Sequence, residues 1–165
     1  MKTLCFLRHA KSSWDDPGLI DRERGLNSRG LRDAPRIGLA LCSRLQPMTI
    51  RVSSARRARM TLAGLIEGWP VLGELDHAVV EDLYTFSGEA LSYWISQQPD
   101  TVDPLFVIGH NPAITDVINW LLGAGRFHNI PTAGFVELHL ALPKWTMLAQ
   151  GCAQLADSVF PKQLT

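Results

Sequence analysis

The sequence predicts an α/β fold: a three-layer α/β/α sandwich around a mostly parallel mixed sheet. Two short apolar runs, Leu4–Leu7 and Leu105–Ile108, have the character of strands that are buried on both faces. Segments with helical spacing of apolar residues alternate with such strands along the chain. The alternating stretch Phe135–Leu142 adds an antiparallel hairpin late in the chain.

Composition is that of an ordinary globular protein, with 165 residues, 46% of them hydrophobic and 19% charged. This length predicts a single domain over residues 1–165. Sixteen basic residues balance sixteen acidic ones, so the composition favours neither a nucleic-acid nor a membrane partner. Cys5, Cys42 and Cys152 lack both a paired framework and metal-ligand spacing, which indicates a cytoplasmic protein.

The first strand, Leu4–Leu7, leads into a polar loop over Ala10–Leu26 that contains prolines and glycines. Loops of this length are often functional. Asn27 or Ser28 is suited to cap the helix that follows, and Pro35 could kink it. Its apolar stripe comprises Leu31, Ala34, Ile37, Leu41 and Leu45.

The middle of the chain continues the alternation. Thr49–Val52 is rich in β-formers, and Ser53-Ser54 could cap a helix over Ala55–Glu67. Ala78–Val80 is a weak strand candidate.

Two further helices and a hairpin complete the prediction. The helices are expected over Gly88–Gln97 and Ala113–Leu122. Phe135–Leu142 is expected to pair with a strand at Trp145–Ala149 across a turn at Pro143-Lys144.

Histidines follow both of the most apolar strands. Arg8 and His9 come directly after the first strand, and His110 comes two residues after the second. Because parallel strands end at the same edge of a sheet, His9 and His110 should lie close together there. Open α/β sheets bind ligands at this edge. An arginine beside two histidines indicates an anion site.

Three arginines open the predicted helix after Thr49–Val52. Cations at a helix amino terminus oppose the helix dipole, whereas a bound phosphate would be favoured by the dipole and by the guanidinium groups together. We expect one of Arg56, Arg57 and Arg59 to point inward and the other two to face solvent.

Five segments, in order, resemble motifs of the histidine phosphatase superfamily. They are Arg8–Trp14, Leu26–Gly30, Ser53–Thr61, Gly109–Pro112 and Ile130–Gly134. The resemblance covers nearly the whole chain and implies a phosphoglycerate mutase-like fold.

Three positions depart from the usual motifs. Ala10, followed by Lys-Ser, replaces the usual glycine and is similar to the small phosphohistidine phosphatases of the SixA type. Ser54 stands in place of a proline, and Met60 in place of a glutamine.

The resemblance also implies roles for individual residues. His9 would be the nucleophile, while Arg8, Arg57 and His110 would bind phosphate. Glu81 is the candidate general acid, with Asp82 beside it as an alternative. Neither a metal nor another cofactor is expected.

The sequence therefore predicts a metal-independent phosphatase that acts through a phosphohistidine on His9. The expected substrate is phosphohistidine on a signalling or phosphotransfer protein, because no insertion is long enough to form a lid domain over the site. A phosphatase for a small phosphoester, such as a sugar phosphate, is the first alternative. A weakly catalytic phosphoprotein-binding module is the second.

Overall fold

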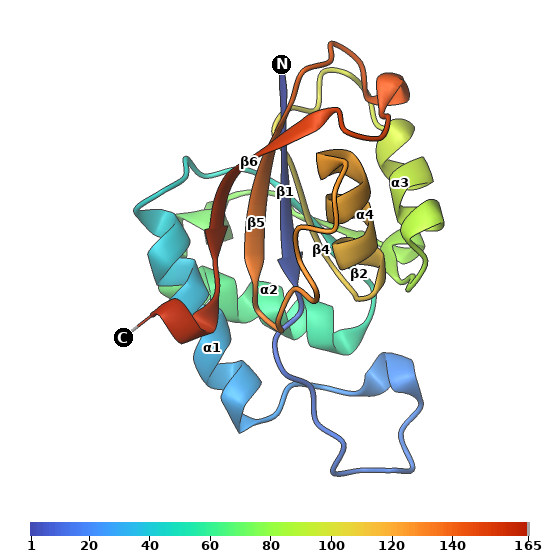
Figure 1. Ribbon diagram of the computed structural model, residues 1–165. Helices are drawn as coiled ribbons and strands as arrows, with labels where there is room; N and C mark the ends of the chain where they lie inside the picture. Colours follow the sequence, from blue (N-terminus) through green and yellow to red (C-terminus); the bar gives the residue numbers. More distant parts are fainter. Residues whose placement is uncertain (165) are drawn as a thin grey trace.

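A computed structural model describes residues 1–164, which contain a six-stranded sheet with strand order β3-β2-β4-β1-β5-β6 (Figure 1). The strands are β1 (Lys2–Arg8), β2 (Ile50–Ser53), β3 (Ala78–Val80), β4 (Leu105–Gly109), β5 (Phe135–Leu140) and β6 (Ala153–Val159). The first four run parallel, whereas β5 pairs antiparallel with β1 and β6 antiparallel with β5. The carboxyl ends of β1 to β4 therefore share one edge of the sheet.

Helices cover both faces of the sheet and make the predicted three layers (Figure 1). The helices are α1 (Ser28–Cys42), α2 (Arg56–Gly68), α3 (Gly88–Ser96) and α4 (Ala113–Leu122). Alternate residues of β1 explain the layering, because Leu4 and Phe6 pack in the core with α3 and α4, while Cys5 and Leu7 pack with α1 and α2. The α/β prediction is confirmed. Within residues 1–164, no helix is long and apolar enough to cross a membrane.

The prediction of a strand at Trp145–Ala149 is wrong. Trp145–Met147 is a short 3₁₀ helix, η4, and the hairpin partner of β5 is β6. The Trp145 ring is fully buried, and its indole N–H donates to the Val102 carbonyl at 2.9 Å. Burying this large ring takes the segment out of the sheet.

The prediction of helix capping is confirmed for α1 and wrong for α2. The Asn27 side chain accepts from the Gly30 N–H at 2.9 Å, and α1 continues through Pro35. Neither Ser53 nor Ser54 caps α2, which begins after Ala55 without a side-chain cap.

Helices α1 and α2 pack closely because glycines line their contact. A methyl group at Gly38 would collide with the backbone carbonyl of Leu65, and one at Gly68 with that of Pro35. At Gly64, it would lie 2.6 Å from the Ala34 side chain. This packing fixes α2, the helix that carries Arg57.

We expect Gly38→Ala to destabilise the protein by about 1–3 kcal/mol, because the added methyl group must push α1 from α2. Helix propensity alone would favour alanine by about 1 kcal/mol. Urea unfolding measures the difference. Gly125→Ala is the control, since an added methyl group there meets no atom of the described residues within 4 Å. Equal stability of the two variants would contradict the prediction.

Candidate active site

The pairing of β1 with β4 brings the two predicted histidines together. Arg8 lies opposite Gly109 in the register, and the His9 N–H donates to the Gly109 carbonyl at 3.0 Å. The rings of His9 and His110 consequently lie 5.2 Å apart between centroids.

The turn before β5 also makes hydrogen bonds to the backbone of Arg8 and His9. The Arg8 N–H donates to the Gly134 carbonyl, and the Ala133 N–H donates to the carbonyls of Arg8 and His9 at 3.0 and 3.1 Å. Ala133 has a φ of +57°, an unusual value for a residue with a side chain. The backbone that carries Arg8 and His9 is therefore fixed on both sides.

The His9 ring has the orientation that a nucleophile needs. Its Nδ1 lies 2.7 Å from the Ala10 carbonyl oxygen. A carbonyl can only accept, so Nδ1 carries the hydrogen and Nε2 keeps a free lone pair. The Ala10 N–H in turn donates to the Thr61 hydroxyl of α2 at 2.9 Å, which ties this segment to the helix of Arg57.

The His110 ring is held by Ser53, the last residue of β2. Its Nε2 lies 2.7 Å from the Ser53 hydroxyl, which also accepts the Ala55 N–H at 3.2 Å. When Ser53 donates to Nε2, the neutral ring carries its hydrogen on Nδ1. That nitrogen is a donor available to a ligand.

Arg57 points inward, as the resemblance to the family motif implies. Its side chain is 2% exposed, whereas Arg56 and Arg59 face solvent. Both Arg57 and Arg8 lower the pKa of each histidine through their positive charge. We call Arg8, His9, Arg57 and His110 the strand-end cluster.

Four buried polar side-chain atoms have no hydrogen-bond partner among the described residues, and all lie in or beside the strand-end cluster. They are Nε of Arg8, Nε of Arg57, Nδ1 of His110 and Oγ of Ser54. An unpaired buried polar atom costs about 1–3 kcal/mol, so such atoms are rare unless a ligand satisfies them. Two guanidinium donors beside an uncapped helix amino terminus suit a phosphate.

Both histidines are neutral at pH 7. Burial lowers the pKa of His9 to about 3, and the positive charges of Arg57 and Arg8 act in the same direction. The pKa of His110 also falls to about 3, chiefly through burial and then through Arg57. Neutral His9 is the protonation state that can attack phosphorus.

Glu81 directly follows β3, and its carboxylate is paired with the guanidinium group of Arg22. The two side chains form a bidentate pair, with Nη2 and Oε2 2.6 Å apart. Hydrogen bonding to Arg22 lowers the pKa of Glu81 to about 2. The nearby Ser54 hydroxyl also lowers the pKa of Glu81. It lies outside hydrogen-bond geometry to any described residue, so this contribution is secondary to that of Arg22. Glu81 is therefore charged at neutral pH.

The residues that surround Arg57 are not among those that the sequence predicts for the site. Asp21 and Arg24, from the long loop, and Tyr84, after β3, form a polar network beside the strand-end cluster. The loop length was the one signal in the sequence, and it did not distinguish these residues from their neighbours.

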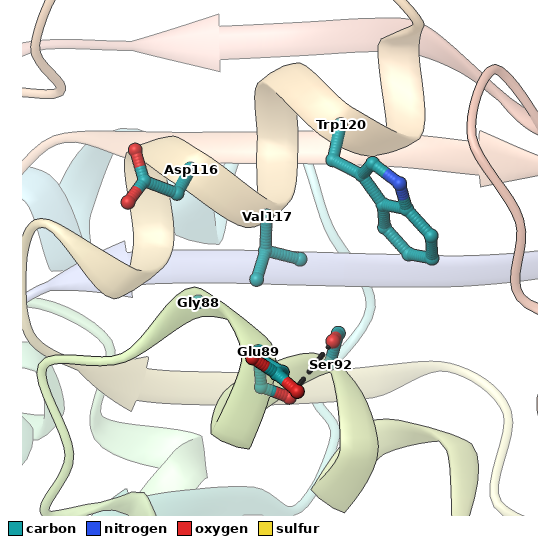
Figure 2. Close-up of a pocket in the computed structure, with 6 residues that line it drawn as sticks. All are labelled: Gly88, Glu89, Ser92, Asp116, Val117 and Trp120. Atoms are coloured by element: carbon teal, nitrogen blue, oxygen red, sulfur yellow. Dashed lines mark hydrogen bonds between the residues drawn. The ribbon is translucent and has the colours of Figure 1, made fainter.

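A separate cavity of about 410 Å³ lies between α3 and α4. Figure 2 shows Asp116 and Trp120 on α4 facing Glu89 and Ser92 on α3. None of the strand-end cluster lines it. The buried unpaired donors identify the site better than this cavity does. Within residues 1–164, no group of three histidine, cysteine or acidic residues could hold a metal ion.

Comparisons with known proteins agree with this geometry. No protein-family model matches the chain. An uncharacterized protein of Mycobacterium tuberculosis is 32% identical over 94% of this chain and 100% of its own length. A SixA protein of Agrobacterium tumefaciens is similar in structure, with a TM-score of 0.79, 25% identity and coverage of 97% of this chain and 98% of the other. A protein histidine phosphatase SixA solved with tungstate has a TM-score of 0.75, 17% identity and 98% coverage of both chains.

The fold and the edge at which its histidines meet define a phosphoglycerate mutase-like α/β protein. The chain belongs to the histidine phosphatase superfamily, and its structural neighbours include the SixA proteins of that superfamily.

We expect the stability of the protein to fall as the pH drops below 6.5. His9 and His110 stay neutral in the folded state down to about pH 3, whereas the unfolded chain protonates them below 6.5. The unfolded state then binds more protons, and each histidine costs up to about 1.4 kcal/mol per pH unit in this window. Urea unfolding at pH 7.5 and 5.0 measures the loss.

The variant His9→Asn/His110→Asn should reduce this pH dependence. Replacement of His128, which is exposed, is the control. An unchanged slope in the double variant would contradict the neutral state of the two rings.

Proposed function

We propose that this protein is a phosphatase that forms a phosphohistidine on His9 and removes phosphate from phosphohistidine on another protein. The observation that carries the proposal is found within residues 1–164: Nε2 of His9 has no hydrogen-bond partner, and three buried nitrogens of the same strand-end cluster are also unpaired. These are Nε of Arg8, Nε of Arg57 and Nδ1 of His110.

The reaction proceeds in two displacements at phosphorus. First, Nε2 of His9 attacks, a bond from nitrogen to phosphorus forms, and the bond to the leaving imidazole breaks. Water then attacks the phosphorylated His9, and inorganic phosphate leaves with Nε2 free again. Charge on the transferred group spreads over its equatorial oxygens, where guanidinium donors stabilise it.

The state of Glu81 supports a phosphoramidate substrate. An alkoxide leaving from a phosphoester needs a strong general acid, whereas a phosphohistidine imidazole is a better leaving group and needs less help. With Glu81 charged and paired to Arg22, its use as that acid would require the pair to break and a proton to be taken up. Cleavage of a phosphoramidate, which does not need Glu81 to be protonated, is therefore favoured over cleavage of a phosphoester.

Exposed apolar side chains around the strand-end cluster support a protein as the substrate. We call the exposed side chains of Trp14, Ile20 and Phe86 the apolar rim. Phe86 packs against His110 with ring centroids 5.4 Å apart, and Ile20 precedes Asp21, which contacts Arg57. Exposed apolar patches beside a site indicate contact with another protein, whereas a sugar phosphate has little apolar surface to bury there.

We expect His9→Ala to lose turnover by at least about 10³-fold, because no other group replaces Nε2 as nucleophile. Rapid acid-free quenching of the wild type with a phosphoramidate substrate should trap base-stable, acid-labile phosphate on His9. His128→Ala, which changes an exposed histidine, is the control. A turning-over enzyme that never carries this phosphate would rule out the covalent route.

We also expect Ile20→Ser to raise KM for a phosphohistidine protein about tenfold and to leave KM for a small phosphoramidate unchanged, because about 1.4 kcal/mol of apolar contact would be lost with the protein alone. Leu39→Ser is the matched control, since both side chains are 68% exposed and Leu39 lies on α1. Equal effects of the two substitutions on the protein substrate would argue against the rim as a contact surface.

A further inference from the structure

Arg57 is held along one edge and free along the other. Its Nη1 donates to the backbone carbonyl of Asp21 at 2.8 Å, and its Nη2 donates to Oδ2 of Asp21 at 2.9 Å. Nε is buried and has no partner among the described residues. The terminal edge of the guanidinium is thus anchored, while the edge that includes Nε is available to a ligand.

Arg8 is held in a similar way. Its Nη1 donates to the Ile130 carbonyl at 2.9 Å, and its buried Nε is likewise unpaired within residues 1–164. Each arginine therefore has a terminal nitrogen fixed on a backbone carbonyl and an Nε left for the anion. The difference is that Arg57 is also fixed by a carboxylate.

Asp21 is itself fixed by further side chains. Its Oδ2 accepts from the Tyr84 hydroxyl at 2.6 Å, and its Oδ1 accepts from Nε and Nη2 of Arg24 at 3.2 and 3.1 Å. Arg24 is buried, donates to the Ser12 hydroxyl at 2.8 Å and stacks on Trp14. Partial burial would raise the pKa of Asp21, but the hydrogen bonds from Tyr84, Arg57 and Arg24 outweigh it and keep the carboxyl charged.

We propose that Asp21 is a positioning residue, which aims the Nε edge of Arg57 at the phosphoryl group and links the Ala10–Leu26 loop to catalysis. This inference rests on the proposed function. Asp21 takes the terminal edge of Arg57 and leaves the Nε edge free, so a substrate phosphate need not displace it.

Whether Asp21→Asn strengthens or weakens phosphate binding distinguishes a positioning role of Asp21 from a purely electrostatic one. Asp21→Asn removes a negative charge beside an anion site, so Coulomb attraction alone would strengthen phosphate binding. Asparagine cannot accept from all the donors around Asp21, because one of its terminal atoms is itself a donor. Loss of the fixed orientation of Arg57 would therefore weaken phosphate binding despite the gain in positive charge.

The test compares Asp21→Asn with Asp15→Asn, which changes an exposed carboxylate in the same loop. Calorimetry with inorganic phosphate at fixed salt measures binding, and a small phosphoramidate gives kcat and KM. We expect Asp21→Asn to bind phosphate more weakly and to lose kcat/KM on the order of 10²-fold, with the wild-type fold by circular dichroism. In an Arg57→Ala background, the same change should have little further effect, because Asp21 acts through Arg57.

Tyr84→Phe provides a second variant, because it removes one donor to Asp21 and keeps the carboxylate. We expect a smaller loss in the same direction. Tighter phosphate binding by Asp21→Asn, an effect no larger than that of Asp15→Asn, or a full additional loss in the Arg57→Ala background would each overturn the positioning role. A wild-type protein that neither binds phosphate nor cleaves the phosphoramidate would instead overturn the proposed function on which this inference rests.

Discussion

The parallel pairing of β1 with β4 is the constraint on which the site depends. It places Arg8 opposite Gly109, so the two residues that follow, His9 and His110, leave the sheet side by side. A shift of one residue in this register would send the alternating side chains of β1 to the wrong cores. The same hydrophobic pattern that builds the two cores therefore also sets the spacing of the histidines.

The two guanidinium groups of the strand-end cluster lack a full set of hydrogen-bond partners within residues 1–164, because the buried Nε groups of Arg8 and Arg57 are unpaired there. Burial, together with the positive charge of these arginines, lowers the pKa of both histidines and keeps them neutral. Donors held by the folded chain would already be oriented for the proposed phosphate, so that little reorganisation would be needed during the proposed reaction. The free energy for this preorganisation comes from folding, through the packing of α1 on α2 and the burial of both faces of the sheet.

Local patterns in the sequence predict most of the fold and part of the site. Apolar runs locate β1 and β4, helical periodicity locates all four long helices, and strand ends locate His9 and His110. The resemblance to the histidine phosphatase superfamily identifies Arg57, among the arginines at the start of α2, as the one that points inward. Apart from the cap predicted for α2, the errors concern contacts between residues distant in sequence. Trp145 leaves the sheet to reach Val102, 43 residues away, and Asp21 reaches Arg57 across 36 residues. No local pattern encodes such contacts.

The backbone conformation of Ala133 is strained, and it accompanies the hydrogen bonds that hold Arg8 and His9. A left-handed backbone at a residue with a side chain costs on the order of 1 kcal/mol, and glycine would avoid that cost. In this conformation the N–H of Ala133 donates to the carbonyls of both Arg8 and His9. Its methyl group is buried in the core beside α1 and α2. The strained turn thus holds in place the peptide that carries Arg8 and His9, at a local cost in free energy.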